Sequence, residues 1–378
     1  MRIALIASST VTVPPAEYGA VEIVIAELGK MLTRLGHSVV VYASGDSTPA
    51  CTLSWRVPKA TPHAPPEREL RHHAFAWGDI ASRTIPFDIV HAHHPTALAL
   101  RGASRAPTVF TLHHDRDDAL LETYADHRDV CYVAMSDGQV DRVREVDIAA
   151  VVHAGLDPDE YPQVDATGEY CAFLGKLTPE KAPHLAIDAA RLAGVPLALC
   201  APETPTSSEY VAQEIQPRLD AAGGAVELHG ALARDRRLAL LQNARALLLP
   251  LDCDDPCTLV SIESMLAGTP VIAFARGSAP EIVEDGVTGF VVRDTKEMAA
   301  RLREVGSIDR GRCRERAIER WSSLRMARAY EGIYECLLSA KRPREIPARE
   351  MRPRAPVPAV VLEPKRRWSG LFSPLWTA

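Results

Sequence analysis

The sequence predicts an α/β protein with two successive domains, each built on a doubly wound parallel sheet. Short apolar segments of strand length alternate with amphipathic helical segments, and this alternation runs twice along the chain. Between the two runs lies HAGLDPDEYPQVDATGE, which is rich in turn residues and lacks periodicity. The length of 378 residues also exceeds what one hydrophobic core usually serves. We therefore expect two sheets with ligand-binding loops at the carboxyl ends of their strands.

The first run begins with MRIALIA, which reads as a buried strand, and continues with a helix over residues 20–35 that ends at Gly36. One face of this helix is apolar, with Val21, Val24, Leu28, Met31 and Leu35. Further strands are expected in HSVVVYA, DIVHAH, APTVFTLHH and DVCYVAMS.

The second run begins with the strand YCAFLG, followed by a helix in PEKAPHLAIDAARLAG that ends at Gly194. Strands are expected in VPLALC, AVELHG and ARALLLP, and closing helices in residues 309–340. The expected division is a first domain over 1–160, a second over 161–320, a closing helix over 321–340 and a flexible basic tail over 341–378.

Composition is that of an ordinary globular protein, with 47% hydrophobic and 24% charged residues. No apolar run approaches the roughly 20 residues of a membrane span, and MRIALIASS is too short and too quickly polar for a signal peptide. The eight cysteines include no CxxC pair. A reduced, cytoplasmic protein is the simplest interpretation.

Charge is distributed unevenly along the chain. The tail from Lys341 carries nine Lys or Arg and three Glu, a net charge of +6. Because the whole chain has a net charge of −6, residues 1–340 have a net charge of −12. An acidic body argues against a nucleic-acid partner. The tail ends in KRRWSGLFSPLWTA, where basic residues adjoin Trp368, Leu371, Phe372, Leu375 and Trp376. Weak contact with an anionic membrane surface is one hypothesis for this segment, and a terminus without such contact is the other.

The segment DDPCTLVSIESMLAGTPVIAF predicts a helix that has an acidic residue on its apolar face. Asp255-Pro256 predicts a helix start, Gly268 its end, and TPVIAF a buried strand. Glu263 falls within the apolar arc of this helix. A carboxylate there is costly unless something hydrogen-bonds to it. Either a structural partner or a polar ligand supplies that hydrogen bond.

Two lysines mark a candidate anion site in FLGKLTPEKAPHLAIDAA. Lys176 and Lys181 lie between the first strand of the second domain and the following helix. Ammonium groups together with free N–H groups at a helix N-terminus suit a phosphate or diphosphate. A solvated pair is the alternative, and it is weakened because doubly wound sheets bind ligands at this place.

With these motifs in place, the sequence resembles the family 4 glycosyltransferases of the GT-B fold, from residue 1 to about 338. FLGKLTPEKAPHLAIDAA is similar to the family's diphosphate loop, and DPCTLVSIESMLAGTPVIAF to its Glu-x7-Glu segment. GSAPEIVEDGVTGFVV, PPAEYGAVEIVIAELGKMLTRLGHSVVVYA and WSSLRMARAYEGIYECLL follow the same order. The resemblance implies two Rossmann-like domains that face each other across a cleft, with a C-terminal helix crossing back to the first domain.

The resemblance also implies residue roles. Asp255 takes the place of the first acid, near the donor sugar, and Glu263 that of the second, which accepts hydrogen bonds from the ribose. Lys176 and Lys181 would hold the diphosphate, and His113 would be the active-site histidine near the reacting sugar. The backbone N–H groups expected to reach phosphate or sugar oxygens belong to Thr258, Leu259 and Val260. Gly19 matches the first glycine of the amino-terminal pair. The expected catalytic residues are thus Asp255, His113 and Lys181.

The chain departs from the family pattern at several of these positions. Ala20 replaces the second glycine, Lys176 replaces an arginine, Asp255 replaces a glutamate, and Cys257-Thr258 replace Phe-Gly. These departures leave the identity of the donor open.

Some candidate residues also have structural alternatives. Asp255 can be a helix cap alone, and Gly19 a residue that allows a tight turn. Ser278-x-x-Glu281 predicts a capping box, which would make Glu281 structural. The histidines of VHAHHP, His91, His93 and His94, are more often strand-end packing than substrate contacts.

The function these expectations support is transfer of a sugar, with retention, from a UDP- or GDP-linked donor to an acceptor hydroxyl that the sequence does not identify. No metal or other cofactor is expected. The alternative is a non-catalytic GT-B subunit that binds a nucleotide sugar or a partner enzyme. Two metal-dependent rivals rest on Asp252-Cys253-Asp254, a DxD motif, and on His91-x-His93, a possible start of a binuclear hydrolase site.

Overall fold

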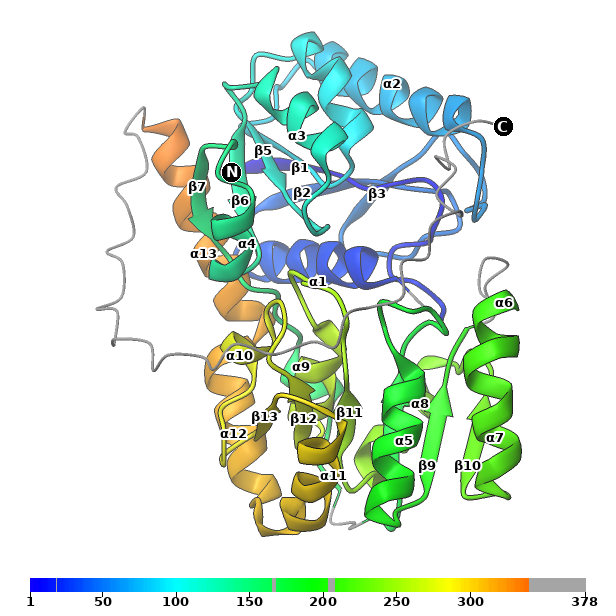
Figure 1. Cartoon of the computed structure of the whole chain (residues 1–378). Coiled ribbons are helices and arrows are strands. Elements are labelled where there is room, and N and C mark those ends of the chain that lie inside the picture. The colour runs from blue at the N-terminus through cyan, green and yellow to red at the C-terminus, as the bar shows by residue number, and fades with distance from the viewer. Residues whose placement is uncertain (18, 165–167, 203–207, 340–378) are drawn as a thin grey trace.

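The computed structural model of the chain describes residues 1–17, 19–164, 168–202 and 208–339. These residues form two parallel sheets, one above the other in Figure 1. The first has seven strands in the order β3-β2-β1-β4-β5-β6-β7, and the second has six in the order β10-β9-β8-β11-β12-β13. The prediction of two doubly wound parallel sheets is therefore confirmed.

The first sheet contains β1 (Arg2–Ile6), β2 (Ser38–Tyr42), β3 (Thr52–Ser54), β4 (Ile89–Ala92), β5 (Thr108–Thr111), β6 (Cys131–Ala134) and β7 (Ile148–Val151). Its helical segments are α1 (Ala20–Arg34), α2 (Pro66–Ser82), η1 (Pro95–Ala103), α3 (Asp118–Ala125), α4 (Asp137–Arg142) and η2 (Pro158–Glu160). The sequence did not predict β3 or β7. Both are edge strands that are not fully buried. β3 has only three residues, one of them apolar, whereas the four residues of β7 are apolar but only half-buried.

The second sheet contains β8 (Cys171–Leu174), β9 (Leu197–Cys200), β10 (Val226–His229), β11 (Leu247–Leu249), β12 (Val271–Phe274) and β13 (Gly289–Val292). Its helical segments are α5 (Pro183–Ala193), α6 (Ser208–Tyr210), η4 (Val211–Ile215), α7 (Gln216–Ala222), α8 (Arg234–Asn243), α9 (Leu259–Leu266), α10 (Ala279–Ile282), α11 (Thr295–Glu304) and η5 (Val305–Ser307). The chain then closes with α12 (Arg310–Trp321) and α13 (Ser323–Leu338).

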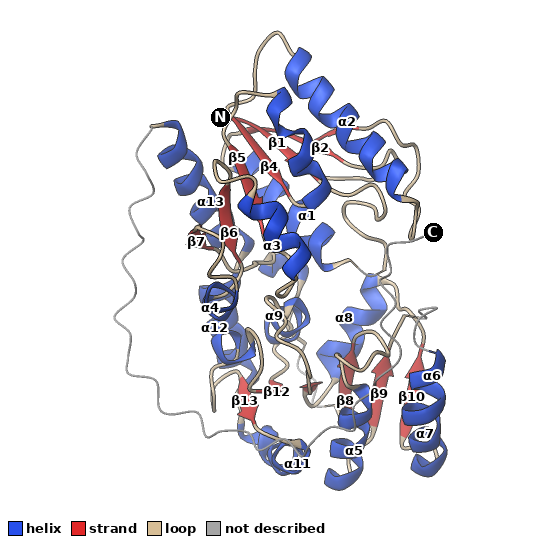
Figure 2. Cartoon of the chain, turned by 45° about the horizontal axis from the view of Figure 1, so that its top comes forward, coloured by secondary structure: helices blue, strands red, loops and turns tan. Residues whose placement is uncertain are grey.

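Helices cover both faces of each sheet, as Figure 2 shows. Strands buried on both faces read as continuous apolar runs, which is why the central strands were predictable. In the first domain, α2 packs against one face with the buried Trp77, whose Nε1–H donates to the carbonyl of Ala97 at 2.8 Å. On α1, Val24, Leu28 and Met31 are buried as predicted, and Gly36 follows the helix with φ of +89°.

The last helix returns to the first domain. In Figure 1, α13 rises along the side of the molecule from the lower domain to the upper one. Tyr334 Oη lies 2.8 Å from His91 Nδ1, and Tyr330 Oη lies 2.7 Å from Thr111 Oγ1. Both tyrosines are fully buried among strands β4 and β5 of the first sheet. The expectation of a helix that crosses back is confirmed.

The return to the first domain passes through a tight backbone contact at Gly155. Leu156 bridges Ser322, and a Cβ on Gly155 would lie 2.3 Å from the Ser322 carbonyl oxygen. Gly155→Ala should therefore lower the free energy of unfolding in urea by about 3 kcal/mol, because backbone atoms cannot yield as a flexible side chain can. Gly332→Ala on α13, where a Cβ would meet nothing within 4 Å, is the control. It should raise stability by about 0.5–1 kcal/mol. Equal effects of the two substitutions would contradict this account.

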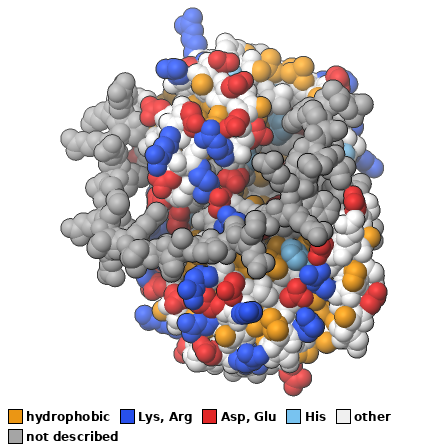
Figure 3. Space-filling view, viewed as in Figure 1, with side chains coloured by type: hydrophobic (Ala, Val, Ile, Leu, Met, Phe, Trp, Pro, Cys, Tyr) orange, Lys and Arg blue, Asp and Glu red, His pale blue; other side chains and the backbone are white. Residues whose placement is uncertain are grey.

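No helix in the described part of the chain has the length and apolarity needed to cross a membrane. Figure 3 shows Lys and Arg side chains mixed with Asp and Glu over both domains on the face in view. The tail 341–378, and with it the hypothesis of contact with a membrane surface, lies outside the described residues.

Candidate active site

A cavity of about 340 Å³ lies between the two domains. Its second-domain wall comes from the loops after β8 and β11 and from the start of α9, and its first-domain wall from the start of α1 and the loop after β5. Every site residue predicted from the sequence lines it: Gly19, His113, Lys176, Lys181, Asp255, Thr258, Leu259, Val260 and Glu263.

The order of the strands explains where the cavity forms. In the second sheet β8 lies between β9 and β11, so the chain reverses its winding direction at β8. Loops that leave the carboxyl ends of strands at such a point diverge, and ligands bind between them. The lysine loop leaves β8 and the loop that carries Asp255 leaves β11. The topology therefore brings the two motifs together although about 75 residues separate them.

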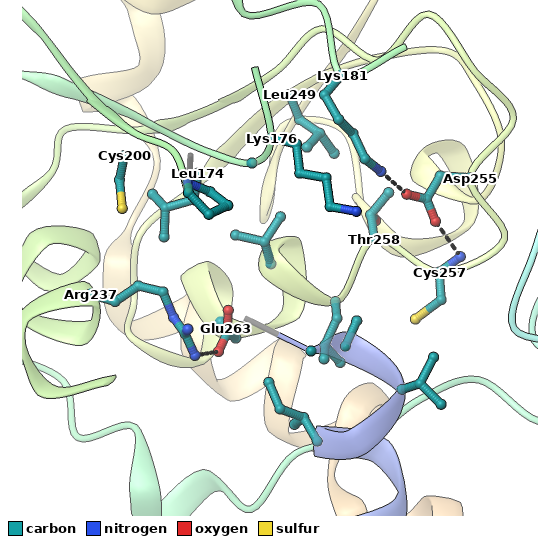
Figure 4. Close-up of a pocket in the computed structure, with 18 of the residues that line it drawn as sticks. Leu174, Lys176, Lys181, Cys200, Arg237, Leu249, Asp255, Cys257, Thr258 and Glu263 are labelled. Atoms are coloured by element: carbon teal, nitrogen blue, oxygen red, sulfur yellow. Dashed lines mark hydrogen bonds and ion pairs between the residues drawn. The ribbon is translucent and has the colours of Figure 1, made fainter. Parts of the chain in front are cut away.

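One end of the cavity is cationic. Lys176 and Lys181 extend toward Asp255 in Figure 4, and Lys181 Nζ lies 2.5 Å from Asp255 Oδ2. The two side chains of that pair are about one-fifth exposed, so the ion pair faces the cavity rather than bulk solvent. Ammonium groups here can approach the oxygens of a bound anion and exchange Asp255 for them.

The prediction that α9 starts at Asp255-Pro256 was wrong, because the helix begins at Leu259. Asp255 Oδ1 instead accepts the Cys257 backbone N–H at 3.0 Å, a local turn that competes with helix formation. The Thr258 N–H donates to Ser278 Oγ at 3.3 Å, so this predicted ligand donor already has a protein acceptor. Gly268 does follow the helix end, with φ of +80°.

Glu263 has side-chain partners that the sequence did not reveal. Its carboxylate is 5% exposed, and Oε1 accepts hydrogen bonds from Arg237 Nη2 at 3.0 Å and from Tyr161 Oη at 3.2 Å. Among the described residues no hydrogen bond reaches Oε2. The cost of burying this acid is therefore offset by protein groups on one oxygen, and the other oxygen can accept from a ligand in the cavity that Glu263 lines.

Arg237 is a cavity residue that the sequence analysis missed. It lies on α8, pairs with Glu263 as Figure 4 shows, and its Nη1 donates to the Glu17 carbonyl of the first domain at 2.5 Å. The segment RDRRLALL offers several arginines and no pattern that marks one of them. Only the packing of α8 beside α9 selects Arg237.

The first domain contributes Gly19 and His113 to the opposite wall. A Cβ on Gly19 would lie 2.7 Å from Glu22 Oε2 and 3.0 Å from Pro15 Cβ, so close packing at the start of α1 requires glycine. His113 Nε2 lies 2.9 Å from His93 Nδ1. Burial lowers the pKa of His113 to about 3, which makes it a neutral hydrogen-bonding group at pH 7.

Comparison with known proteins gives a glycosyltransferase family model for each half of the chain. Residues 21–160 match the family model described as Glycosyltransferase Family 4, and residues 168–307 match the one described as Glycosyl transferases group 1. The chain belongs to the glycosyltransferases. The structure of this glycosyltransferase is accordingly of the GT-B type, with its cavity between the two domains.

Two curated relatives show how far the similarity extends. The alpha-maltose-1-phosphate synthase of Mycolicibacterium smegmatis is 33% identical over 54% of this chain and 58% of its own length. The D-inositol 3-phosphate glycosyltransferase of Nocardia farcinica is 30% identical over 58% of this chain and 50% of its own length. The glycosyltransferase thus spans between half and three-fifths of these relatives.

Solved structures match over most of the chain. Sucrose-phosphate synthase from Thermosynechococcus elongatus superposes with a TM-score of 0.74 at 19% identity, covering 90% of this chain and 100% of that one. HepE from Anabaena, solved with UDP and glucose, superposes with a TM-score of 0.71 at 19% identity and the same coverage. At such identities the similarity establishes the fold.

Residues of both metal-binding rivals have protein partners in the structure of the glycosyltransferase. His91 uses both ring nitrogens, on Tyr334 and on Thr111 Oγ1 at 2.8 Å each, and is fully buried. In the DxD motif, Asp252 pairs with Arg276 at 2.8 Å, and Asp254 Oδ1 accepts the Gly277 N–H at 3.1 Å. These contacts favour structural roles for His91, Asp252 and Asp254.

The predicted capping box at Ser278 and Glu281 was also wrong, since Ser278 makes no side-chain cap on α10. Glu281 instead reaches the first domain. It accepts the backbone N–H groups of Gly138 at 2.7 Å and Asp137 at 2.9 Å, and lies 3.1 Å from His153 Nε2. A carboxylate is stabilised at a helix N-terminus such as that of α4. The hydrogen bonds of Glu281 therefore stabilise the contact between the two domains of the glycosyltransferase.

This stabilisation should depend on pH. Burial raises the pKa of Glu281, but hydrogen bonds from His153, Gly138 and Asp137 outweigh burial and leave the pKa below its ordinary 4.5. A lowered folded-state pKa contributes stability above pH 4.5 that is lost as pH falls through the folded value. Glu281→Gln should therefore lower the melting temperature clearly at pH 6 and much less at pH 3.5.

The exposed Glu122 provides the control for this prediction. Glu122→Gln should change the melting temperature little at either pH. If Glu281→Gln destabilised the protein equally at both pH values, the ionised carboxylate would not be what joins the domains.

Proposed function

We propose that this chain transfers a sugar, with retention, from a UDP- or GDP-linked donor to an acceptor hydroxyl. The observation that supports this most strongly is the cavity between the domains, which is lined by Lys176, Lys181, the start of α9 and Glu263 together. A nucleotide diphosphate sugar carries a ribose, a diphosphate and a sugar in that order. The cavity offers a carboxylate for hydroxyls at Glu263 and cations for the diphosphate at the lysines.

In the proposed reaction the bond between the anomeric carbon and the diphosphate oxygen breaks, and a bond between that carbon and the acceptor oxygen forms on the same face. The acceptor proton passes to the departing phosphate oxygen, so no side chain needs to act as a general base. Because the acceptor attacks from the same face, no side chain needs to act as a nucleophile either. The barrier lies in separating a cationic sugar ring from an anionic diphosphate. Lys176 and Lys181 lower it by stabilising the charge that develops on the leaving group.

First-domain residues complete the site in this proposal. His113 is neutral at pH 7 and can donate to or accept from a sugar hydroxyl near the reacting carbon. Gly19 allows the start of α1 to lie against the donor. Asp255 would accept hydrogen bonds from hydroxyls of the donor sugar once the diphosphate draws Lys181 away. No metal is part of the proposed reaction.

The names of relatives bear on substrates only by analogy. HepE has been solved with UDP-glucose, which favours a uridine donor. By name, one curated relative synthesises a phosphorylated sugar and the other is a glycosyltransferase of D-inositol 3-phosphate. A phosphorylated hydroxyl compound is therefore a first choice of acceptor to assay.

A thermal-shift screen with UDP, GDP, ADP and dTDP and their glucose or mannose conjugates tests the proposal. Binding to the folded state alone raises stability by about 2.7 kcal/mol at a ligand concentration of 100 Kd, so the cognate nucleotide should raise the melting temperature and the others should not. Release of the nucleotide from its sugar conjugate then tests turnover. Binding without any turnover, with or without acceptor, would favour the non-catalytic subunit, and no shift with any nucleotide would contradict both.

A further inference from the structure

A second cluster of polar side chains lies in the first domain, outside the cavity between the domains. Glu69 and His73 stand one turn apart on α2, and His94 follows β4. One ligand-capable atom from each lies within 4.8 Å of the other two. We propose that Glu69, His73 and His94 bind a divalent transition-metal ion of the zinc class.

The spacing in the sequence supports this assignment. Residues at i and i+4 of a helix project from the same face, so Glu69 and His73 approach one point, with Glu69 Oε1 3.2 Å from His73 Nε2. Ligands about 2.1 Å from a tetrahedral ion lie roughly 3.4 Å apart, and this pair already has that separation. Only His94 would have to move to complete the coordination of the ion. Its Nδ1 accepts the Thr96 N–H at 3.3 Å, a long hydrogen bond that can be given up.

The hydrogen bonding of the cluster is incomplete without a cation. His73 is fully buried, yet neither of its ring nitrogens makes a hydrogen bond of acceptable geometry. Glu69 is 6% exposed and accepts from the Ser9 N–H at 3.1 Å and the Ser9 hydroxyl at 2.8 Å. Unpaired buried polar groups are rare because each costs free energy. A bound metal ion would satisfy His73 and the carboxylate together.

The charges around the cluster also favour a bound cation. Among the described residues no Lys or Arg forms an ion pair with Glu69, whose side chain is buried. A buried carboxylate beside two imidazoles, without a Lys or Arg partner in the described part of the chain, is a site that favours a cation. Two imidazoles and a carboxylate are a donor set that zinc and its neighbours in the transition series favour over magnesium or calcium.

The position of the site suggests what the ion does. It would join α2 to the loop after β1, through Ser9, and to the loop after β4, through His94. His93, next to His94 in the chain, contacts the cavity residue His113 at 2.9 Å. The metal would therefore fix the loop that positions His113 while lying outside the path of sugar transfer. Three protein ligands leave a fourth position for water.

Metal binding can be measured without any assay of sugar transfer. The full chain is stripped with a chelator, dialysed against ZnCl₂ and analysed for zinc, and we expect one tightly held ion per chain. His73→Gln and His94→Gln should each weaken binding by more than the 10- to 100-fold that loss of an outer partner costs. His229→Gln is the matched control, because His229 Nε2 lies 3.6 Å from Glu227 in a pair without a third ligand, and it should retain the ion.

Two further measurements keep the proposal open to refutation. Zinc should raise the melting temperature of the wild type and of His229→Gln but not of His94→Gln, whose partly exposed position makes it the variant least disruptive to folding. The spectrum of the Co²⁺-loaded chain should show nitrogen and oxygen ligands. Zinc binding that survives both substitutions, thiolate ligation of cobalt by any of the eight free cysteines, or no retained zinc would each overturn the proposal. Nucleotide binding is unaffected by these outcomes, so the proposed function stands or falls separately.

Discussion

Lys181→Met is expected to lower kcat/KM for sugar transfer by about 100- to 1,000-fold, the usual effect of removing one group that stabilises transition-state charge. Methionine keeps the length and most of the packing of lysine but removes the ammonium group, so the departing diphosphate loses a cation. The substitution also leaves Asp255 without the partner that lies 2.5 Å away. We expect kcat to carry most of the loss, since the charge on the leaving oxygen grows toward the transition state.

Lys296→Met provides the control, because Lys296 is exposed on α11 and does not line the cavity. It should leave kcat and KM within about twofold of wild type, as surface substitutions usually do. Steady-state kinetics on both variants, with the cognate nucleotide sugar identified by thermal shift, make the comparison. A Lys181→Met enzyme with wild-type kcat would remove the lysine from the chemistry and leave it a structural partner of Asp255.

Glu263→Gln is expected to weaken binding of the nucleotide by about 10- to 100-fold, the worth of hydrogen bonds to a charged acceptor. The amide preserves the volume and keeps an oxygen for Tyr161, but it can no longer offer a charged oxygen to the two ribose hydroxyls. Isothermal titration with the free nucleotide measures this directly, since the effect does not depend on turnover.

Stability complicates the interpretation of Glu263, because removing its charge leaves the largely buried Arg237 with the Glu17 carbonyl but without its carboxylate partner. Breaking one side of a buried pair costs about 3–5 kcal/mol, so Glu263→Gln alone should melt at a lower temperature. The double variant Glu263→Gln, Arg237→Met removes both charges and should recover much of that stability without recovering nucleotide affinity. If affinity returned together with stability, Glu263 would act only by holding the fold of α8 against α9.

The central strands and the residues of the candidate site could be predicted from the sequence for physical reasons. Strands β1, β4 and β8 are buried and largely apolar, whereas the edge strands β3 and β7 are only partly buried. The predicted site residues of the second domain lie in motifs that follow β8 and β11, and strand order brings these two motifs to one cavity. The strand predictions rested on periodicity, which reflects burial, and the roles of the site residues rested on the resemblance of these motifs to family 4 glycosyltransferases.

The features that escaped prediction depend on partners distant in the chain. Nothing near Glu263 indicates that Arg237 and Tyr161 will meet it, and nothing near Ser278 indicates that Glu281 will prefer α4 of the other domain. A local capping rule and a longer-range hydrogen bond compete for the same carboxylate, and the tertiary structure decides. The start of α9 shows the same competition on a smaller scale. The Asp255 side chain accepts the Cys257 N–H in a local turn, and the helix begins only at Leu259.

The course of α13 has a consequence for how this chain can be divided. Tyr330 and Tyr334 fill the interior of the first domain although they follow the entire second domain in the sequence. A fragment ending at residue 160 would expose the pocket that these rings occupy and leave His91 and Thr111 without their hydroxyl partners. A chimera that exchanges donor specificity should therefore replace an internal cassette and retain native sequence on both sides of it, as in the insertion of one domain into a loop of another.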